Sequence, residues 1–154
     1  MVFALWFLVF ECVVTTRAST SLTEVLTMKR TNFENLRIYQ LSEKLADQVW
    51  RIVICWENLG KDTLGKQLVR AVDSIGANIA EGSGRGSDAE LRRFLRISRG
   101  SLYETKHWLR RAYKRRLLTE RQVAELIPVI EELVPRLNAY LRSVNQMKRS
   151  SKTK

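Results

Sequence analysis

The chain has 154 residues, which is enough for one domain with a buried core and too few to expect two. Its formal net charge of +11 is larger than solubility requires and favours a polyanionic partner or an anionic surface. Cys12 and Cys55 lie far apart without a CxxC motif and His107 is the single histidine, so we expect no metal site and no cofactor. Cys55 has apolar neighbours, and we expect it in the core of a cytoplasmic protein.

Residues 1–27 do not share the pattern of the rest of the chain and are assigned to an apolar extension outside the core. The run Val2–Val14 is nearly all apolar, but it is shorter than the roughly 20 residues that a membrane-spanning helix needs. It has features of a signal peptide, although no Lys or Arg precedes the apolar run. We favour a second interpretation, in which Met28 is the natural start and the extension comes from a start codon assigned too early.

Residues 28–146 are predicted to form four amphipathic helices. The first is expected over Glu34–Glu57, a segment without Gly or Pro that keeps apolar residues at a helical period. Its apolar positions are Ile38, Leu41, Leu45, Val49, Ile52 and Trp56. Trp50 and Trp56 are interpreted as anchors of the core or of an interface.

The second helix is expected after a turn over Asn58–Lys61, with Asp62 as its N-cap. Small residues surround its apolar stripe, so neighbouring helices can approach closely. The stripe consists of Leu68, Val72, Ile75 and Ile79, at steps of four and three. Ser74 and Asn78 stand beside it, and each needs a hydrogen-bond partner if it is buried.

A glycine-rich turn separates the second helix from the third. We expect the second helix to stop at Gly82 and Gly84 in the left-handed backbone conformation. Ser87 and Glu90 have the spacing of a capping box, which predicts that the third helix begins there. The glycines and Arg85 also resemble a phosphate cradle, but no strand precedes them and the GK[ST] ending of a P-loop is missing. A plain interhelical turn is therefore favoured.

The third helix carries two parallel stripes. The apolar stripe, which we expect to face the core, consists of Leu91, Leu95, Ser98, Leu102, Thr105, Leu109 and Ala112. A second line begins one residue later and lies about 100° around the helix. This basic line consists of Arg92, Arg96, Arg99, Tyr103, Lys106, Arg110 and Tyr113. At about 1.5 Å per residue it spans on the order of 30 Å, which is long enough to follow several phosphates.

Positive charge is concentrated on this helix. Residues 88–116 hold ten basic residues against three acidic ones, a net charge of +7 out of the chain's +11. Surface charge usually means a solvated helix face, but such faces pair Glu with Lys at four-residue spacing, and the basic line does not. We therefore predict that the basic line and the adjacent Arg111 contact nucleic acid, with Tyr103 and Tyr113 available for stacking on bases.

The fourth helix is predicted to begin at a second capping box, formed by Thr119 and Gln122. Its apolar stripe consists of Val123, Leu126, Ile130, Val134 or Leu133, Leu137, Leu141 and Val144. Because the apolar period continues through Pro128 and Pro135, we expect one bent helix and not two. Residues 147–154 are assigned to a disordered basic tail. Together these elements predict an all-α, up-down-up-down, left-handed four-helix bundle.

The run SIGANIAEGSGR contains Ser74, Asn78, Glu81, Gly82 and Arg85. Further residues belong to the same pattern, namely Phe33–Leu36, Gln67, Arg70, Ala71, Phe94, Leu95, Gly100–Leu102 and Glu104. With these residues the chain resembles the four-helix-bundle proteins encoded within intervening sequences of bacterial 23S ribosomal RNA genes. The resemblance implies structural roles for the motif residues and covers the whole chain except its ends.

The resemblance also implies an assembly. Proteins of this kind form homo-oligomers, commonly pentameric rings, and the related accessory variability determinant of diversity-generating retroelements is a basic pentamer that binds nucleic acid and a reverse transcriptase. No enzyme activity carries over from the family. A ring of five copies would combine weak phosphate contacts into multivalent binding.

These observations predict a non-enzymatic, oligomeric bundle that binds RNA or DNA, without a small-molecule substrate and without a membrane partner. The alternative is an accessory scaffold that binds a reverse transcriptase or another protein, and the neighbouring genes would distinguish the two. An enzyme is the least favoured class. Glu81 and Glu104 are the acidic residues nearest the motif, and we interpret them as groups that hold Arg70 or Arg85 in place or cap the backbone.

Overall fold

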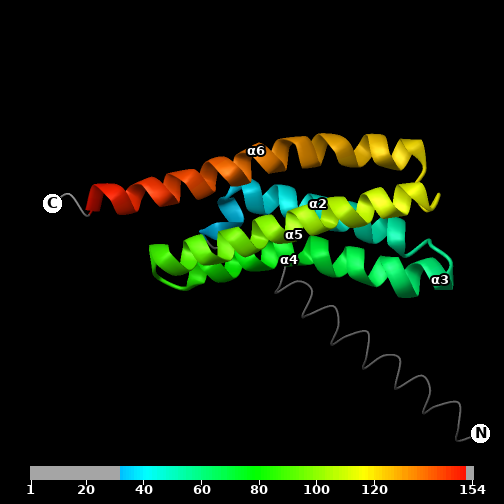
Figure 1. Ribbon diagram of the computed structural model, residues 1–154, viewed down its shortest axis with the longest axis horizontal. Helices are drawn as coiled ribbons and strands as arrows, with labels where there is room; N and C mark the ends of the chain where they lie inside the picture. The colour runs from blue at the N-terminus through cyan, green and yellow to red at the C-terminus, as the bar shows by residue number, and fades with distance from the viewer. Residues whose placement is uncertain (1–31, 152–154) are drawn as a thin grey trace, which may run out of the picture. The chain divides into compact units, whose positions relative to one another are not determined.

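A computed structural model describes residues 32–151, with side chains as far as residue 146. Over this range the protein is an all-helical bundle with four long helices and no strand (Figure 1). The predictions for residues 1–27, including the two interpretations of the apolar run, lie outside the described residues. The elements in chain order are η1 (Phe33–Asn35), α2 (Arg37–Val53), α3 (Asn58–Gly60), η2 (Lys61–Gly65), α4 (Lys66–Gly84), α5 (Asp88–Lys114) and α6 (Glu120–Ser151).

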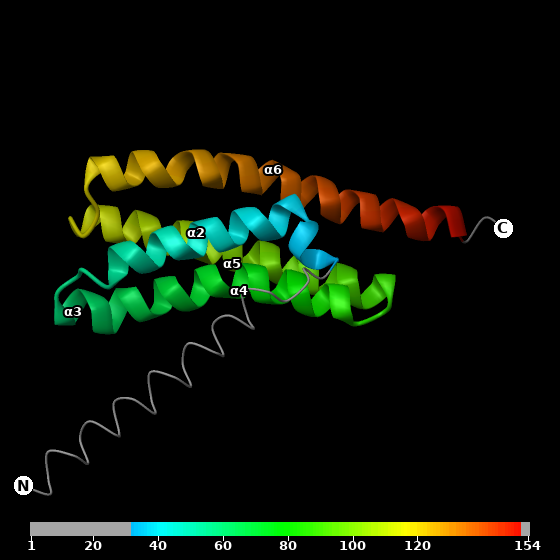
Figure 2. The same ribbon diagram turned by 180° about the vertical axis from the view of Figure 1, so that it is seen from behind.

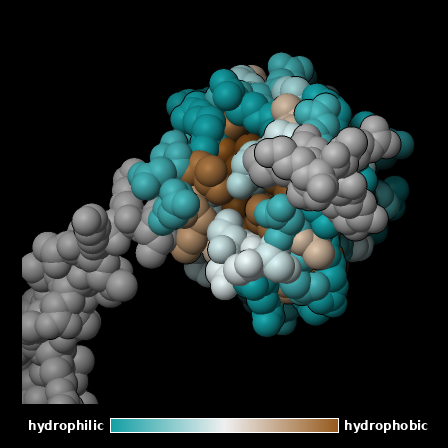
Figure 3. All heavy atoms as spheres, turned by 90° about the vertical axis from the view of Figure 1, so that its left-hand side faces the viewer, coloured by the Kyte–Doolittle hydropathy of each residue, from teal (hydrophilic) through white to brown (hydrophobic). Residues whose placement is uncertain are grey.

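The four long helices lie side by side around one apolar core, as Figures 1 and 2 show from opposite sides. The helix α4 packs against α2 and α5, while α6 packs against α2 and α5. An end view shows hydrophobic residues in the middle of the bundle and hydrophilic residues around them (Figure 3). The apolar core side chains with no exposed surface are Leu45, Ile75, Ile79, Leu95, Ala112, Leu133 and Leu137. These residues confirm the apolar stripes predicted for all four helices.

The helices α4 and α5 approach each other closely, because small residues stand at their contact. Gly82 is buried, and a Cβ atom built on it would lie 2.8 Å from Cβ of Phe94. The buried Ser98 hydroxyl donates a hydrogen bond to the Ile75 carbonyl oxygen at 3.0 Å, so α5 is also joined to the α4 backbone. This contact fixes which side of α5 faces the core.

The first long helix is shorter than the predicted Glu34–Glu57. It begins at Arg37 after the 3-10 turn η1 and ends at Val53. Cys55 lies beyond the end of α2 and is exposed, so its assignment to the core is wrong. Trp50 is 56% exposed and is not a core anchor either, because Val49 and Val53 occupy the core side of this helix.

The predicted cap at Asp62 is also wrong. Asp62 lies inside η2, a π-helical segment, and its carboxylate pairs with Lys66 at 3.0 Å. Gly60 and Gly65 both have right-handed helical dihedral angles, so α3, η2 and α4 form one continuous helical segment. A continuous helix has no free amide groups at this point, and Asp62 therefore has nothing to cap.

The turn between α4 and α5 begins later than predicted. Gly82 and Gly84 are both helical, and the residue with a left-handed φ of 69° is Gly86. The cap at Ser87 is confirmed, because its hydroxyl accepts a hydrogen bond from the Glu90 amide at 3.3 Å. The Glu90 carboxylate forms an ion pair of 3.3 Å with Arg93, three residues later in α5.

One helix, α6, contains both prolines, as predicted. The reciprocal cap is also present: the Thr119 hydroxyl accepts from the Gln122 amide at 3.2 Å, and the Gln122 side chain accepts from the Thr119 amide at 2.9 Å. Of the two alternatives in the predicted stripe, Leu133 is buried and Val134 is half-buried. Ile130 is only half-buried, and the buried Val129, which the prediction did not include, lies on the core side. The helix continues to Ser151, so helical backbone extends into the segment predicted to be a tail.

Replacing Gly82 with alanine should destabilise the bundle. The added methyl group would overlap the Phe94 Cβ atom, and we expect the free energy of unfolding to fall by about 1–3 kcal/mol. Gly100→Ala is the matched control, because Gly100 is an exposed residue of α5 and its added methyl group would have no other atom within 4 Å. It should raise the free energy of unfolding by up to about 1 kcal/mol. Urea unfolding of both variants checks this, and equal effects would contradict the close approach of α4 and α5.

Candidate nucleic-acid interface

The basic line lies largely on the surface of α5. Arg96, Arg110 and Arg111 are exposed, and Arg99 and Lys106 are half-buried. Tyr103 and Tyr113 each expose 52% of their surface, so both rings are available for stacking. The apolar stripe next to this line is buried, which confirms that the two stripes face in different directions.

The exposed cations of this surface have no carboxylate partner in the described part of the chain. The ion pairs found there join Arg37 or Arg136 to Glu132, and otherwise join residues three or four positions apart in the sequence. None of these pairs includes a cation between Arg96 and Arg116. The acidic residue in the middle of α5, Glu104, accepts a hydrogen bond from the Trp108 ring nitrogen at 3.2 Å. Its neighbours at three and four residues include no Lys or Arg, which explains why the charge stays uncompensated.

Arg92 does not belong to this exposed surface, contrary to the sequence prediction. It exposes 8% of its surface, and its guanidinium donates a long hydrogen bond of 3.5 Å to the Val144 carbonyl oxygen. Val144 lies in the later part of α6, which therefore covers this part of α5. We define the α5 cationic face as Arg96, Arg99, Lys106, Arg110 and Arg111, together with the two exposed tyrosines.

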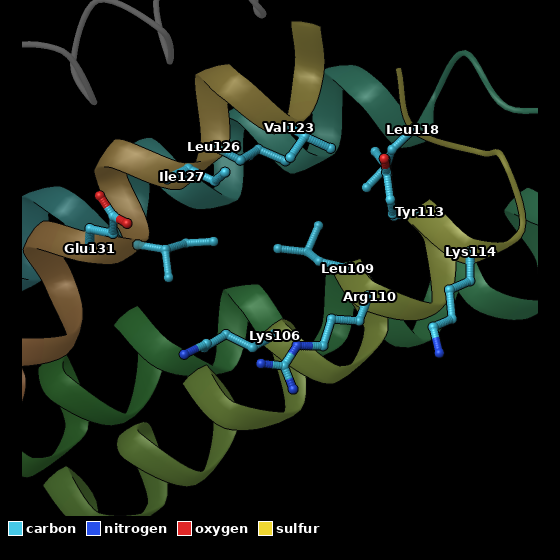
Figure 4. Close-up of a pocket in the computed structure, with 11 residues that line it drawn as sticks. Lys106, Leu109, Arg110, Tyr113, Lys114, Leu118, Val123, Leu126, Ile127 and Glu131 are labelled. Carbon is cyan, nitrogen blue, oxygen red and sulfur yellow. The ribbon is translucent and has the colours of Figure 1, made fainter. Parts of the chain in front are cut away.

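A groove borders this face between the last turns of α5 and the first turns of α6. Lys106, Arg110, Tyr113 and Lys114 form its α5 side, and its volume is about 440 Å³. Its apolar lining comes from Leu109, Leu118, Val123, Leu126, Ile127 and Ile130. Figure 4 shows Leu109 pointing toward the α6 side chains, with the cationic side chains along the α5 edge. Sequence reasoning missed the groove, because it is formed by two helices and neither stripe alone predicts it.

Comparison with known proteins places the chain in a family. The family model described as 23S rRNA-intervening sequence protein matches residues 34–139. The chain belongs to this family. The matched range begins in η1 and extends into α6, so it includes the whole α5 cationic face. None of the curated proteins matches the chain.

A solved structure from Bacteroides thetaiotaomicron is similar to this family member. It is described as a protein with unknown function from the S23 ribosomal protein family. The match has a TM-score of 0.62 and 23% sequence identity, and it covers 68% of this chain and 97% of that one. At this identity the similarity supports the fold alone.

The motif residues of this family member make contacts within the bundle. Ser74 and Asn78 are half-buried, and the Asn78 side chain donates to the Ser74 carbonyl oxygen at 2.6 Å. Glu81 pairs with Arg85, and this contact raises the pKa of the Arg85 guanidinium. Arg85 also lies over the Phe94 ring at 5.3 Å from its centre. The Arg85–Phe94 contact ties the end of α4 to the start of α5, whereas the other two contacts lie within α4 and its C-cap.

The described residues contain neither of two further kinds of site. No group of three His, Cys, Asp or Glu side chains is placed there to hold a metal ion. Within the same range, no helix is both long enough and apolar enough to cross a bilayer.

Charge reversal at Arg92 and at Arg96 should have different effects on stability. Arg92→Glu would place a carboxylate at a buried position facing the Val144 carbonyl oxygen in place of the donor that bonds it, and we expect a loss of about 1–3 kcal/mol in the free energy of unfolding. Arg96→Glu changes an exposed side chain and should stay within about 0.5 kcal/mol. Chemical denaturation measures both. Equal losses would show that Arg92 is as accessible as the rest of the predicted line.

Proposed function

We propose that this member of the 23S rRNA-intervening sequence family is a cytoplasmic, non-enzymatic bundle that binds RNA or DNA through phosphate contacts. The observation that supports this function is the α5 cationic face, whose side chains are accessible and have no carboxylate partners in the described range. Exposed charges without partners are well suited to a ligand that carries regularly spaced negative charges. The family description, which refers to 23S rRNA, is consistent with RNA as the ligand.

The dimensions of the face fit a strand of nucleic acid. From Arg96 to Arg110 the helix rises by about 21 Å, so one strand can contact several cations in succession. Phosphate contacts of this kind do not distinguish bases, and we propose binding without sequence preference. Tyr103 and Tyr113 lie among the cations and supply aromatic surfaces for stacking.

We also propose an up-down-up-down connection and a left-handed twist for the bundle. The colour gradients of Figures 1 and 2, which reverse along successive long helices, support the alternating directions. The helix α6 contacts both α2 and α5, so the first and the fourth long helices are neighbours, as expected for a closed four-helix bundle. The left-handed twist is the usual geometry for such connections.

Assembly into a homo-oligomer is part of the proposal. Trp50 and Ile54, one helical turn apart at the end of α2, expose 56% and 45% of their surface, and Leu59 in α3 exposes 79%. Exposed apolar side chains that lie together favour a contact with another protein. Trp50 and Ile54 also border a groove of about 390 Å³ between α2 and α4. By resemblance we propose a pentamer. The same surface favours the second candidate function, a scaffold that binds a protein such as a reverse transcriptase.

Native mass spectrometry of the full chain tests the assembly. We expect a mass of several copies, and Trp50→Glu together with Ile54→Glu should convert it to single chains, because both changes place charge in an apolar contact. A single-chain mass for the unmodified protein would contradict the oligomer. If that single chain binds a purified protein partner through Trp50, the scaffold is the better description.

Charge reversal on the α5 cationic face tests nucleic-acid binding. We expect the triple variant R96E/R99E/R110E to lower the affinity for a structured RNA by at least about 100-fold at low salt, because three attractive phosphate contacts become repulsive. Fluorescence anisotropy measures the affinity.

The control for that experiment reverses three arginines elsewhere. R121E/R136E/R142E changes the net charge by the same amount, but its exposed positions lie on α6 and outside both grooves. It should lower the affinity much less. Equal losses in the two triple variants would indicate that net charge alone attracts the RNA, and unchanged binding in R96E/R99E/R110E would refute the site.

A further inference from the structure

The groove between α5 and α6 has charge on one side and apolar surface on the other. Lys106, Arg110 and Lys114 lie at four-residue steps along its α5 edge, so successive cations are separated by about 6 Å of helix rise. The opposite wall, from α6, is apolar apart from Glu131. Lys106, Arg110 and Tyr113 belong both to this groove and to the predicted basic line. A strand held by these residues would therefore lie at the mouth of the groove.

We infer that the protein binds unpaired nucleic acid, with phosphates on Lys106, Arg110 and Lys114 and with one or more bases inserted into the α5–α6 groove. This inference rests on the proposed function and specifies its ligand as a single strand. A single strand has its charge on the backbone and uncharged flat rings beside it, which matches the two sides of the groove. A base-paired strand keeps its bases stacked inside the duplex and cannot place them there.

The groove can accept a base without reading its identity. Its volume of about 440 Å³ is in the range of pockets that hold small organic groups. Leu109 and Leu126 supply apolar surface from opposite sides, and Ile127 at the rim exposes 44% of its side chain. The half-exposed Tyr113 ring offers a face for stacking. Because this lining offers few hydrogen-bonding groups to base edges, insertion should depend on the presence of a base and only weakly on its type.

The test compares three fluorescently labelled ligands with the full-length protein. These are a uridylate RNA of about 16 nucleotides, a strand of equal length with the bases removed from its sugars, and a duplex RNA of equal length. All three present phosphates, but only the uridylate strand presents unpaired bases. We expect it to bind about tenfold more tightly than the other two at the same salt concentration.

A groove variant assigns the effect of the bases to this site. Ile127→Gln makes the groove rim polar without adding charge, and it should remove most of the preference for uridylate RNA while leaving the base-free strand unaffected. Ile97→Gln is the matched control, because Ile97 is 42% exposed on α5 and does not line the groove. It should leave the binding of all three ligands unchanged.

The outcomes separate this inference from the proposed function. Equal affinity of the unmodified protein for all three ligands would overturn base insertion but leave phosphate binding in place. Failure to bind any of them at low salt would overturn the proposed function itself. If Ile127→Gln changes the number of copies in a native mass spectrum and not the preference for bases, the groove is a protein contact and the inference is wrong.

Discussion

Burial of one side of α5 against α4 determines how the rest of this surface is arranged. Leu95, Leu102 and Leu109 alternate with Ser98 and Thr105 along that side, and burying each leucine is worth about 1.5–3 kcal/mol. Rotating α5 to hide its cations would expose these leucines and bring unpaired charges into the core, which costs far more than leaving the cations in water. The rotation of α5 is therefore fixed by its apolar stripe, and the neighbouring basic residues from Arg96 to Arg111 lie at the surface, while Arg92 is covered by α6.

The distribution of carboxylates makes this outward face unusual. Glu132 is shared by Arg37 and Arg136, and Arg37 lowers the pKa of that carboxyl group first through a side-chain hydrogen bond. Asp47 and Asp73 lie together in a cleft between α2 and α4, where burial and then the Asp47 charge raise the pKa of Asp73. These three carboxylates lie on α2, α4 and α6, and Glu104 in the middle of α5 forms none of the ion pairs found among the described residues. Its cations keep their full attraction for an external polyanion, which is the basis of both proposals.

The sequence was informative about patterns that repeat within one helix. The apolar stripes of α2, α4 and α5 and the caps at Ser87 and Thr119 depend on spacing along the chain, and these were predictable. Arg92 was not, because its burial depends on a crossing by α6 near Val144, some 52 residues later in the chain. Cys55 and Asp62 were misassigned because the end of α2 and the continuous α3–α4 helix are set by tertiary contacts. The α5–α6 groove was missed for the same reason: it exists only between two helices.

The salt dependence of binding tests the central claim most directly, since it reports the number of phosphates neutralised. For a single-stranded RNA, the logarithm of the association constant should fall linearly with the logarithm of the salt concentration. Contacts with three or more phosphates per chain predict a slope of about −2 or steeper. An affinity that does not change with salt would show that the exposed cations of α5 do not hold the ligand, and the account of this surface would be wrong.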